Sequence, residues 1–222
     1  PVPAPASGPV LDPQARYFAV RQAFADLGIA FTPATLVHDG AKAADVASSL
    51  TGPLVLKCNV ASSVHKTAEG AVRMGVDGPE ELTAAFADLE TAGRRLGADG
   101  VVAEETATGS LYLLLGAHRD DQFGEVVIIG AGGLTVEENE DITLGLARYV
   151  QDERAAERLI VETACGRYLR KHAPDAFSSL TSWLLAFSSW FMANPQLTSA
   201  EINPCMVDVS ADTIAAVDAR VE

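Results

Sequence analysis

The spacing of apolar residues along the chain predicts several amphipathic helices. Apolar positions that recur every three or four residues mark the buried face of a helix, as Tyr17, Val20 and Phe24 do near the start of the chain. Asp12 is placed to cap that helix and Gly28 to end it. The pattern predicts helices over residues 12–28, 41–50, 79–96, 152–171 and 176–192.

Short apolar runs between glycine, proline and polar residues predict strands. The runs 111–117 and 126–129 are joined by the polar turn RDDQFG and are expected to form a hairpin, and a second hairpin over 201–209 and 213–217 ends the chain. The segment GAGG at 130–133 is expected to interrupt the regular structure. Hairpins and short helices in this mixture favour an α+β fold over a doubly wound parallel sheet. The remaining strands are predicted at 35–38, 54–57, 72–76 and 101–105.

Length and composition allow one large domain or two small lobes. The chain has 222 residues, of which 48% are hydrophobic, so a sizeable core can form. Residues 1–10, PVPAPASGPV, are rich in proline, alanine and serine and are predicted to be a linker or tail. The chain is therefore interpreted as a domain over 11–222, with the possibility that it is one piece of a longer protein.

The charge of the chain argues against two classes of partner. Its formal net charge is −14, from 30 acidic and 16 basic residues. Such a surface repels phosphates of nucleic acids and anionic lipids, so neither is an expected partner, and any anionic ligand needs a local binding site. No apolar run reaches the length of a membrane span. Cys58, Cys165 and Cys205 are odd in number and far apart, which predicts reduced thiols in a cytoplasmic protein.

A loop with a histidine, a lysine and a glycine follows the apolar strand that ends at Lys57. Lys57 either extends its ammonium group out of the core or presents a fixed positive charge to phosphate oxygens. His65 and Lys66 are either solvated loop residues or, with Gly70, part of a loop that covers phosphates. A neutral imidazole can also accept a phosphoryl group.

Two groups of polar residues lie at other predicted strand ends. Glu201 and Asn203 share one face of a strand, and Asp218 follows across the hairpin. These oxygen ligands suit Mg²⁺, although a solvated hairpin face is the alternative. Glu104 and Glu105 end another strand and are either a solvated edge or a hinge that offers carboxylates and backbone groups to adenine and ribose.

The ordered set of motifs resembles a known family. The runs LVLKCNVASSVHKTAEGAVRMGV, GVVAEETATG, LLLGAHRDDQFGEVVIIGAGGLTVE, EINP and AVDARV are similar to the ATP-grasp domain of NDP-forming acyl-CoA synthetases. Relatives in this family include the β subunit of ADP-forming acetate–CoA ligase and, more distantly, that of succinyl-CoA synthetase. The resemblance implies an ATP-grasp fold whose two lobes, expected at 30–103 and 104–222 with the helix 12–28 on the latter, close on Mg·ATP.

The resemblance also implies roles for individual residues. Lys57 would contact the α- and β-phosphates, with Lys66 and Gly70 contributing from the loop. Glu105, with Glu104 beside it, would lie near adenine or ribose. Asn203 and Asp218 would hold Mg²⁺. His65 would relay the phosphoryl group, and Glu201 would steady the phosphohistidine. The implied cofactors are ATP or ADP and Mg²⁺, and the implied partner is a CoA-binding and ligase subunit or fused domain, through which the carboxylic acid and CoA are bound.

Four positions depart from the family pattern. Tyr112 replaces a glutamate, Glu140 replaces a basic residue, Gly145 replaces an arginine, and Ala71 replaces the second glycine of the histidine loop. On the basis of the family resemblance, the chain is still interpreted as an enzyme component that transfers phosphoryl groups. The alternatives are a catalytically degenerate module that senses nucleotide or acyl-CoA, such as one within a protein acetyltransferase, and a purely structural partner domain.

Overall fold

The computed structural model describes residues 8–40, 45, 49–133 and 141–222. Runs of antiparallel strands and runs of helices follow one another along these residues, which confirms the predicted α+β class. The chain divides into two compact units. The smaller unit consists of Gln14–Ala19 and Thr32–Ala107, and the larger unit of Pro1–Pro13, Val20–Phe31 and Thr108–Glu222.

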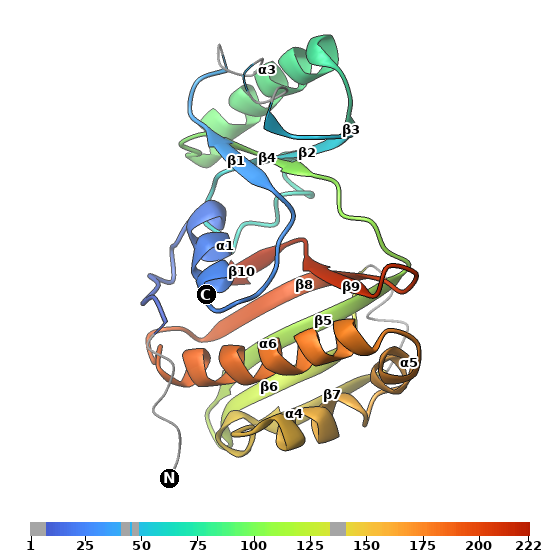
Figure 1. Ribbon diagram of the computed structural model, residues 1–222. Coiled ribbons are helices and arrows are strands. Elements are labelled where there is room, and N and C mark those ends of the chain that lie inside the picture. Colours follow the sequence, from blue (N-terminus) through green and yellow to red (C-terminus); the bar gives the residue numbers. More distant parts are fainter. Residues whose placement is uncertain (1–7, 41–44, 46–48, 134–140) are drawn as a thin grey trace. The chain divides into compact units, whose positions relative to one another are not determined.

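The smaller unit is a four-stranded antiparallel sheet with one long helix on one face (Figure 1). Pro79 begins the helix and Gly97, in the left-handed conformation with φ 70°, ends it. The helix buries Leu82, Phe86 and Leu89 against the sheet. In sheet order the strands are β1 (Ala34–Val37), β4 (Val101–Glu105), β2 (Leu54–Cys58) and β3 (Val72–Val76), and the helix is α3 (Pro79–Leu96).

The larger unit is built on an antiparallel sheet in the order β10-β8-β5-β6-β7, with β9 paired to β8. Three helices pack on one face of this sheet (Figure 1). The strands are β5 (Leu111–Asp120), β6 (Gly124–Ala131), β7 (Ile142–Leu146), β8 (Ser199–Asp208), β9 (Thr213–Ala216) and β10 (Ala219–Val221), and the helices are α4 (Glu153–Ile160), α5 (Ala164–His172) and α6 (Pro174–Met192). A short 3₁₀ turn, Ala147–Tyr149, leads from β7 toward α4. Among the described residues, no helix combines the length and apolar character needed to cross a membrane.

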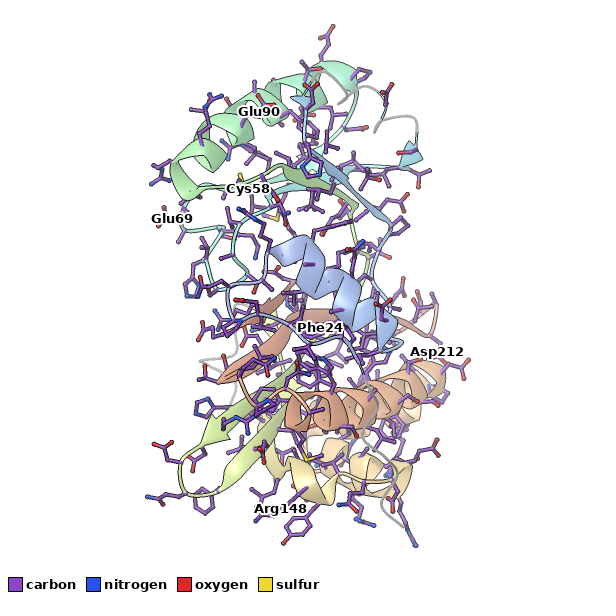
Figure 2. The ribbon with its side chains drawn as sticks, turned by 90° about the vertical axis from the view of Figure 1, so that its left-hand side faces the viewer. Phe24, Cys58, Glu69, Glu90, Arg148 and Asp212 are labelled. Carbon is purple, nitrogen blue, oxygen red and sulfur yellow. The ribbon has the colours of Figure 1, made fainter. Side chains whose placement is uncertain are left out.

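Aromatic residues join α1 (Tyr17–Asp26) to α6 within the larger unit. The ring of Phe24, a residue labelled in Figure 2, meets the rings of Phe187 and Trp190 edge-on. The ring centroids are 5.4 and 5.0 Å apart, respectively. Trp190 Nε1 also donates a hydrogen bond to the Pro9 carbonyl at 2.8 Å. Of the predicted tail, residues 1–7 lie outside the described residues, and Pro9 is anchored by this contact.

The first helix begins later than the sequence predicted. It starts at Tyr17 rather than near Asp12. Arg16 instead forms a β-bridge with Ala61, and the Tyr17 amide donates to the Val60 carbonyl at 2.9 Å. The backbone before Tyr17 therefore bonds to the segment after β2, which overrides the local helix-start signal.

Three further predictions about the elements were wrong or incomplete. The helix over 152–171 is two helices, because the Thr163 hydroxyl accepts the Gly166 amide at 3.0 Å and starts α5 anew. The GAGG segment does not interrupt β6 at once, since Gly130 still pairs with both neighbouring strands. Strands β7 and β10 were not predicted at all. The helix predicted over 41–50 lies largely outside the described residues.

The carboxylate of Asp141 adds a second cap to α5. It accepts hydrogen bonds from the amides of Ala164 and Cys165 at 2.6 and 2.7 Å. Burial works to raise the pKa of Asp141, but these hydrogen bonds outweigh it and hold the pKa below its ordinary value. The fold therefore favours the charged form of this group.

Replacing Asp141 with alanine is expected to lower the free energy of unfolding by about 1 kcal/mol at neutral pH, as for other lost helix caps. Because the folded-state pKa is depressed, the contribution is present above the unfolded-state pKa of about 3.9 and disappears as the pH falls through the folded-state value. Urea unfolding from pH 7 to pH 3 measures this. The control is Asp121→Ala in the exposed turn after β5, and a difference between Asp141→Ala and wild type that does not shrink in acid would contradict the assignment.

Candidate functional site

Lys57 is buried in the smaller unit and is paired there. Its side chain lies on β2, and its Nζ is 2.9 Å from Oε2 of Glu104 on the neighbouring strand β4. The same Nζ donates to the hydroxyl oxygen of Tyr17 at 3.0 Å. The lysine does not extend into solvent, because only 4% of it is exposed.

Tyr17 connects Lys57 to the histidine loop. Its hydroxyl donates to Glu104 Oε1 at 2.6 Å. The ammonium groups of Lys57 and Lys66 lie 4.7 and 4.6 Å from the centroid of its ring, within the range of cation–π attraction. These four residues, each at most 5% exposed, are called the lysine cluster below. The lysine cluster brings two positive charges and one carboxylate together in an otherwise acidic protein.

The loop that carries His65 and Lys66 is held by its own backbone. The Glu69 amide donates to the His65 carbonyl at 3.2 Å, and the Ala71 amide donates to the Lys66 carbonyl at 2.8 Å. Gly70 has φ 67°, so this turn needs a residue that tolerates the left-handed region. Lys66 is thereby turned inward, while His65 on the same loop is exposed.

Two contacts fix this loop to the rest of the smaller unit. Arg95 of α3 pairs with the Glu69 carboxylate at 3.1 Å and donates to the Glu69 carbonyl at 3.0 Å. Ala71, where the family has a second glycine, is fully buried in the apolar core of this unit. The substitution of glycine by Ala71 is therefore accommodated.

Glu104 and Glu105 point in opposite directions because successive side chains of a strand alternate. Glu104 belongs to the lysine cluster. Glu105 is partly exposed and accepts hydrogen bonds from the amide and the hydroxyl of Thr51 at 2.8 and 2.9 Å. Of the two acidic residues, only Glu105 is thus accessible at the end of β4.

The polar residues predicted near the end of the chain come together in the larger unit. The Asn203 amide donates to the Asp218 carbonyl at 3.1 Å, and Asn203 Oδ1 accepts the Gly133 amide at 3.1 Å. Glu201 lies on the same strand, in register with Arg220 of β10, and their side chains form an ion pair at 2.8 Å. The structure thus brings the three predicted residues of this hairpin side by side.

These residues suit a cation that keeps most of its water. Within the described ranges, no three His, Cys, Asp or Glu side chains are grouped as ligands for a metal. Asp218 and the amide oxygen of Asn203 are hard donors, and Mg²⁺ typically takes one or two carboxylates together with phosphate oxygens and water. The donor set therefore fits Mg²⁺ bound with a nucleotide better than a fully enclosed metal centre.

Two residues of these sites were missed in the sequence. Tyr17 was interpreted only as part of an apolar helix face, and nothing in its local pattern indicates contacts with residues 40 to 87 positions away. Arg220 could have been found, because its place in AVDARV puts it opposite Glu201 in an antiparallel pair.

The departures from the family pattern have different structural settings. Tyr112 on β5 is 43% exposed. A Cβ atom at Gly145 would lie 2.8 Å from Leu159 Cδ2, so the space beside this glycine is filled by α4. Glu140 lies outside the described residues.

The cysteines are suited to structural rather than chemical roles. Burial raises the pKa of Cys205 to about 12 and is the main cause that raises the pKa of Cys165 to about 11. It also raises the pKa of Cys58, which lies beneath α3 (Figure 2). All three are buried free thiols, protonated at neutral pH, and therefore poor nucleophiles and metal ligands.

Residues 15–222 match the ATP-grasp domain family. The chain is 30% identical over 187 residues to acetate–CoA ligase (ADP-forming) I of Archaeoglobus fulgidus, which covers 81% of this chain and 27% of that protein. It is 27% identical over 209 residues to a trans-feruloyl-CoA synthase from an unknown prokaryotic organism, covering 91% of this chain and 29% of the relative. The chain thus spans less than a third of the length of these curated relatives.

Two further similarities concern proteins of comparable length. The β subunit of acetate–CoA ligase (ADP-forming) I from Pyrococcus furiosus is 26% identical over 175 residues, which is 76% of this chain and 74% of the subunit. A chain of acetyl-coenzyme A synthetase 1 from Ca. Korarchaeum cryptofilum, solved with coenzyme A and Ca-AMPCP, superposes with a TM-score of 0.80 at 25% identity. That match covers 93% of this chain and 91% of the other.

Proposed function

The chain belongs to the ATP-grasp domain family, as its motifs indicated, and from that premise we propose that it binds Mg·ATP as a component of an NDP-forming acyl-CoA synthetase. The observation that carries the proposal is the lysine cluster next to the exposed His65. An acidic protein needs a local positive site to hold an anionic nucleotide. Lys57, paired with Glu104, and Lys66, which lies over the Tyr17 ring and follows His65 in the loop, supply that site.

In this proposal the smaller unit binds the nucleotide. Lys57 and Lys66 neutralise phosphate oxygens, and Gly70 gives the loop the turn that brings Lys66 inward. Glu104 acts as the counter-ion of Lys57. Glu105, the accessible carboxylate at the end of β4, contributes to binding of adenine or ribose.

His65 is proposed as the phosphoryl acceptor. The lone pair of a neutral imidazole nitrogen attacks the terminal phosphorus of ATP, and a P–N bond forms. The bond from that phosphorus to the β,γ-bridging oxygen breaks, ADP leaves with the electron pair, and the proton on the other ring nitrogen passes to water. Positioning and charge neutralisation are the main contributions of protein to such a transfer. A related Korarchaeum enzyme has been solved with a phosphohistidine segment pointing towards its nucleotide-binding site.

Asn203 and Asp218 are proposed to hold Mg²⁺, which would neutralise phosphate charge when bound. Glu201 is proposed to steady the phosphohistidine through hydrogen bonding. Its ion pair with Arg220 fixes the carboxylate on β8, so its orientation is already set by the sheet.

The remaining chemistry is proposed to lie on partner domains. The curated relatives from Archaeoglobus and from the unknown prokaryote are more than three times as long as this chain. One Pyrococcus relative is a separate β subunit. We therefore infer that a CoA-binding and ligase subunit, or a fused domain, supplies the sites for the carboxylic acid and CoA.

A second candidate function is a sensing module that binds nucleotide or acyl-CoA without turnover. Two observations favour it. Gly145 stands where the family has an arginine, and the adjoining space is filled by Leu159. Tyr112 replaces a glutamate at a half-exposed position of β5. This candidate keeps nucleotide binding and lacks phosphorylation of His65.

Thermal unfolding with and without Mg·ATP tests the proposed site. A ligand at 100 times its dissociation constant stabilises a folded protein by about 2.7 kcal/mol. We expect this gain in the wild-type protein, and we expect Asn203→Ala and Asp218→Asn to reduce it strongly, because the first removes an oxygen donor for Mg²⁺ and the second removes the negative charge that attracts the cation. Asp121→Asn, which neutralises an exposed carboxylate elsewhere in the same unit, is the control.

The outcomes of this experiment separate the candidates. A gain that requires magnesium and is lost in both variants supports the proposed metal ligands. A gain that survives both variants would remove Asn203 and Asp218 from the site. Absence of any gain at millimolar Mg·ATP, in a protein that unfolds cooperatively, would contradict nucleotide binding by this chain.

A further inference from the structure

Tyr17 contacts every other member of the lysine cluster. It is the first residue of α1, and its side chain is fully buried. Its hydroxyl group donates to Glu104 and accepts from Lys57, and its ring lies against the ammonium groups of both lysines. Tyr17 thereby connects the first turn of α1 to strand β2, strand β4 and the histidine loop.

The hydroxyl and the ring of Tyr17 have separate tasks. The hydroxyl completes a triangle in which Lys57 Nζ is 3.0 Å from Tyr17 Oη and 2.9 Å from Glu104 Oε2, while Tyr17 Oη is 2.6 Å from Glu104 Oε1. Two directional contacts fix an ammonium position better than one, because a lysine side chain has four rotatable bonds. The hydroxyl group of Tyr17 therefore helps to fix the position of the Lys57 ammonium group.

The aromatic ring of Tyr17 holds the ammonium group of Lys66. The Lys66 ammonium lies 4.6 Å from the ring centroid, and the negative face of an aromatic ring attracts a cation at this distance. Lys66 is only 5% exposed, and a buried ammonium group is costly unless neighbouring groups stabilise its charge, as the ring does here. The cation–π contact is preserved if the hydroxyl is removed and lost if the ring is removed.

Backbone hydrogen bonds around Tyr17 explain why its side chain can reach both lysines. Its amide donates to the Val60 carbonyl at 2.9 Å, and the neighbouring Phe18 amide donates to Asn59 Oδ1 at 2.9 Å. Both acceptors belong to the segment between β2, which ends one residue after Lys57, and the histidine loop. The start of α1 is thus bound to the chain segment that connects the two lysines.

We propose that Tyr17 is the positioning residue for both lysines of the lysine cluster, with its hydroxyl setting Lys57 and its ring setting Lys66. What the lysines bind rests on the proposed function, whereas their positioning by Tyr17 does not. In an enzyme of this proposed class, Tyr17 prepares two cations in fixed positions before phosphate arrives, although it touches no reacting atom.

Competitive labelling of lysines tests the positioning directly. The chain has lysines only at positions 42, 57, 66 and 171, and Lys171 on α5 is exposed and serves as an internal reference. The folded protein is treated briefly with acetic anhydride, and acetylation of each lysine is measured by mass spectrometry. In the wild-type protein we expect Lys57 and Lys66 to react more slowly than Lys171.

Two variants of Tyr17 are expected to give different patterns. Tyr17→Phe keeps the ring and should raise the labelling of Lys57 severalfold with little change at Lys66. Tyr17→Leu removes both groups and should raise the labelling of both lysines. Tyr168→Phe, at a half-exposed tyrosine of α5, is the matched control and should change neither. Circular dichroism confirms that each variant is folded before labelling.

The same variants connect the positioning to the proposed ligand. If the wild-type protein binds Mg·ATP, Tyr17→Phe should raise its dissociation constant about tenfold, because a hydrogen bond to a charged group is lost. If the wild-type protein does not bind Mg·ATP, the proposed function fails while the labelling result still decides the role of Tyr17. Equal labelling patterns in Tyr17→Phe and Tyr17→Leu, or unchanged labelling of Lys66 in Tyr17→Leu, would overturn the proposal.

Discussion

Replacing Lys57 with methionine is expected to remove the stabilisation by Mg·ATP and to lower the free energy of unfolding by about 3–5 kcal/mol. The loss of stability follows because Glu104, which is 2% exposed, would keep a buried charge without its ammonium partner. The loss of binding follows because the proposed site loses one of its two lysines. Urea unfolding and thermal shifts with Mg·ATP measure the two effects.

A second substitution separates the two roles of Lys57. In Lys57→Met/Glu104→Gln the uncompensated carboxylate is gone, so most of the stability should return, since a buried ion pair contributes little over neutral groups of the same shape. Nucleotide binding should not return, because the positive charge is still missing. Lys171→Met on the exposed face of α5 is the control and should alter neither property. Full stabilisation by Mg·ATP in the double variant would remove Lys57 from the nucleotide site.

Replacing His65 with asparagine is expected to abolish transfer of the terminal phosphoryl group of ATP to this chain. The wild-type protein, mixed with ATP labelled at the γ-phosphate, should acquire a phosphate that is labile in acid and stable in base, as on an imidazole nitrogen. Asparagine cannot supply that nitrogen nucleophile. Because His65 is exposed, its replacement should change the free energy of unfolding by no more than about 0.5 kcal/mol.

The matched control for this variant is His118→Asn. His118 is an exposed histidine on β5, and its loss should leave the labelling unchanged. The enzyme interpretation predicts that His65→Asn still gains stability from Mg·ATP while it incorporates no phosphate. Labelled phosphate that persists in His65→Asn would show that another residue is the acceptor. A wild-type protein that binds Mg·ATP but incorporates no phosphate would instead favour the sensing module.

The two predictions assign different roles to two residues of the smaller unit, Lys57 and His65. Lys57 is expected to matter for both folding and binding, since it is buried in an ionic cluster. His65 is expected to matter for chemistry alone, since it is exposed on a loop whose own hydrogen bonds hold it. With these two roles on different residues, the buried charged site can be stable before the ligand binds, and the exposed histidine remains free to react once the ligand is bound.

Local sequence patterns determined most of the elements. The strands at 72–76 and 101–105 and the helix at 79–96 occur where they were predicted, because each is a short periodic segment with a clear start and stop. Regular elements of this kind depend on neighbouring residues, and that information lies in the chain itself. The order of the motifs also indicated the family, which the match over residues 15–222 confirms.

Elements that depend on distant contacts were not predictable in the same way. The late start of α1 follows from backbone hydrogen bonds to residues 60–62, and the break before α5 from a threonine whose hydroxyl caps a new helix. Strand β7 has a glycine and exposed apolar residues, so its alternation is weak, and pairing with β6 makes it a strand.

In the candidate site, too, some features follow from the local sequence and others depend on contacts between distant residues. The sequence by itself singled out Lys57, His65, Glu201 and Asn203 as candidates, because charge and donor type can be read from a residue name. Only the tertiary structure decided that Glu104 faces inward to Lys57, and that Tyr17 joins the two lysines. Periodicity tells which face of an element is buried, whereas the residues that cover that face come from segments up to 87 positions apart and meet only when the chain has folded.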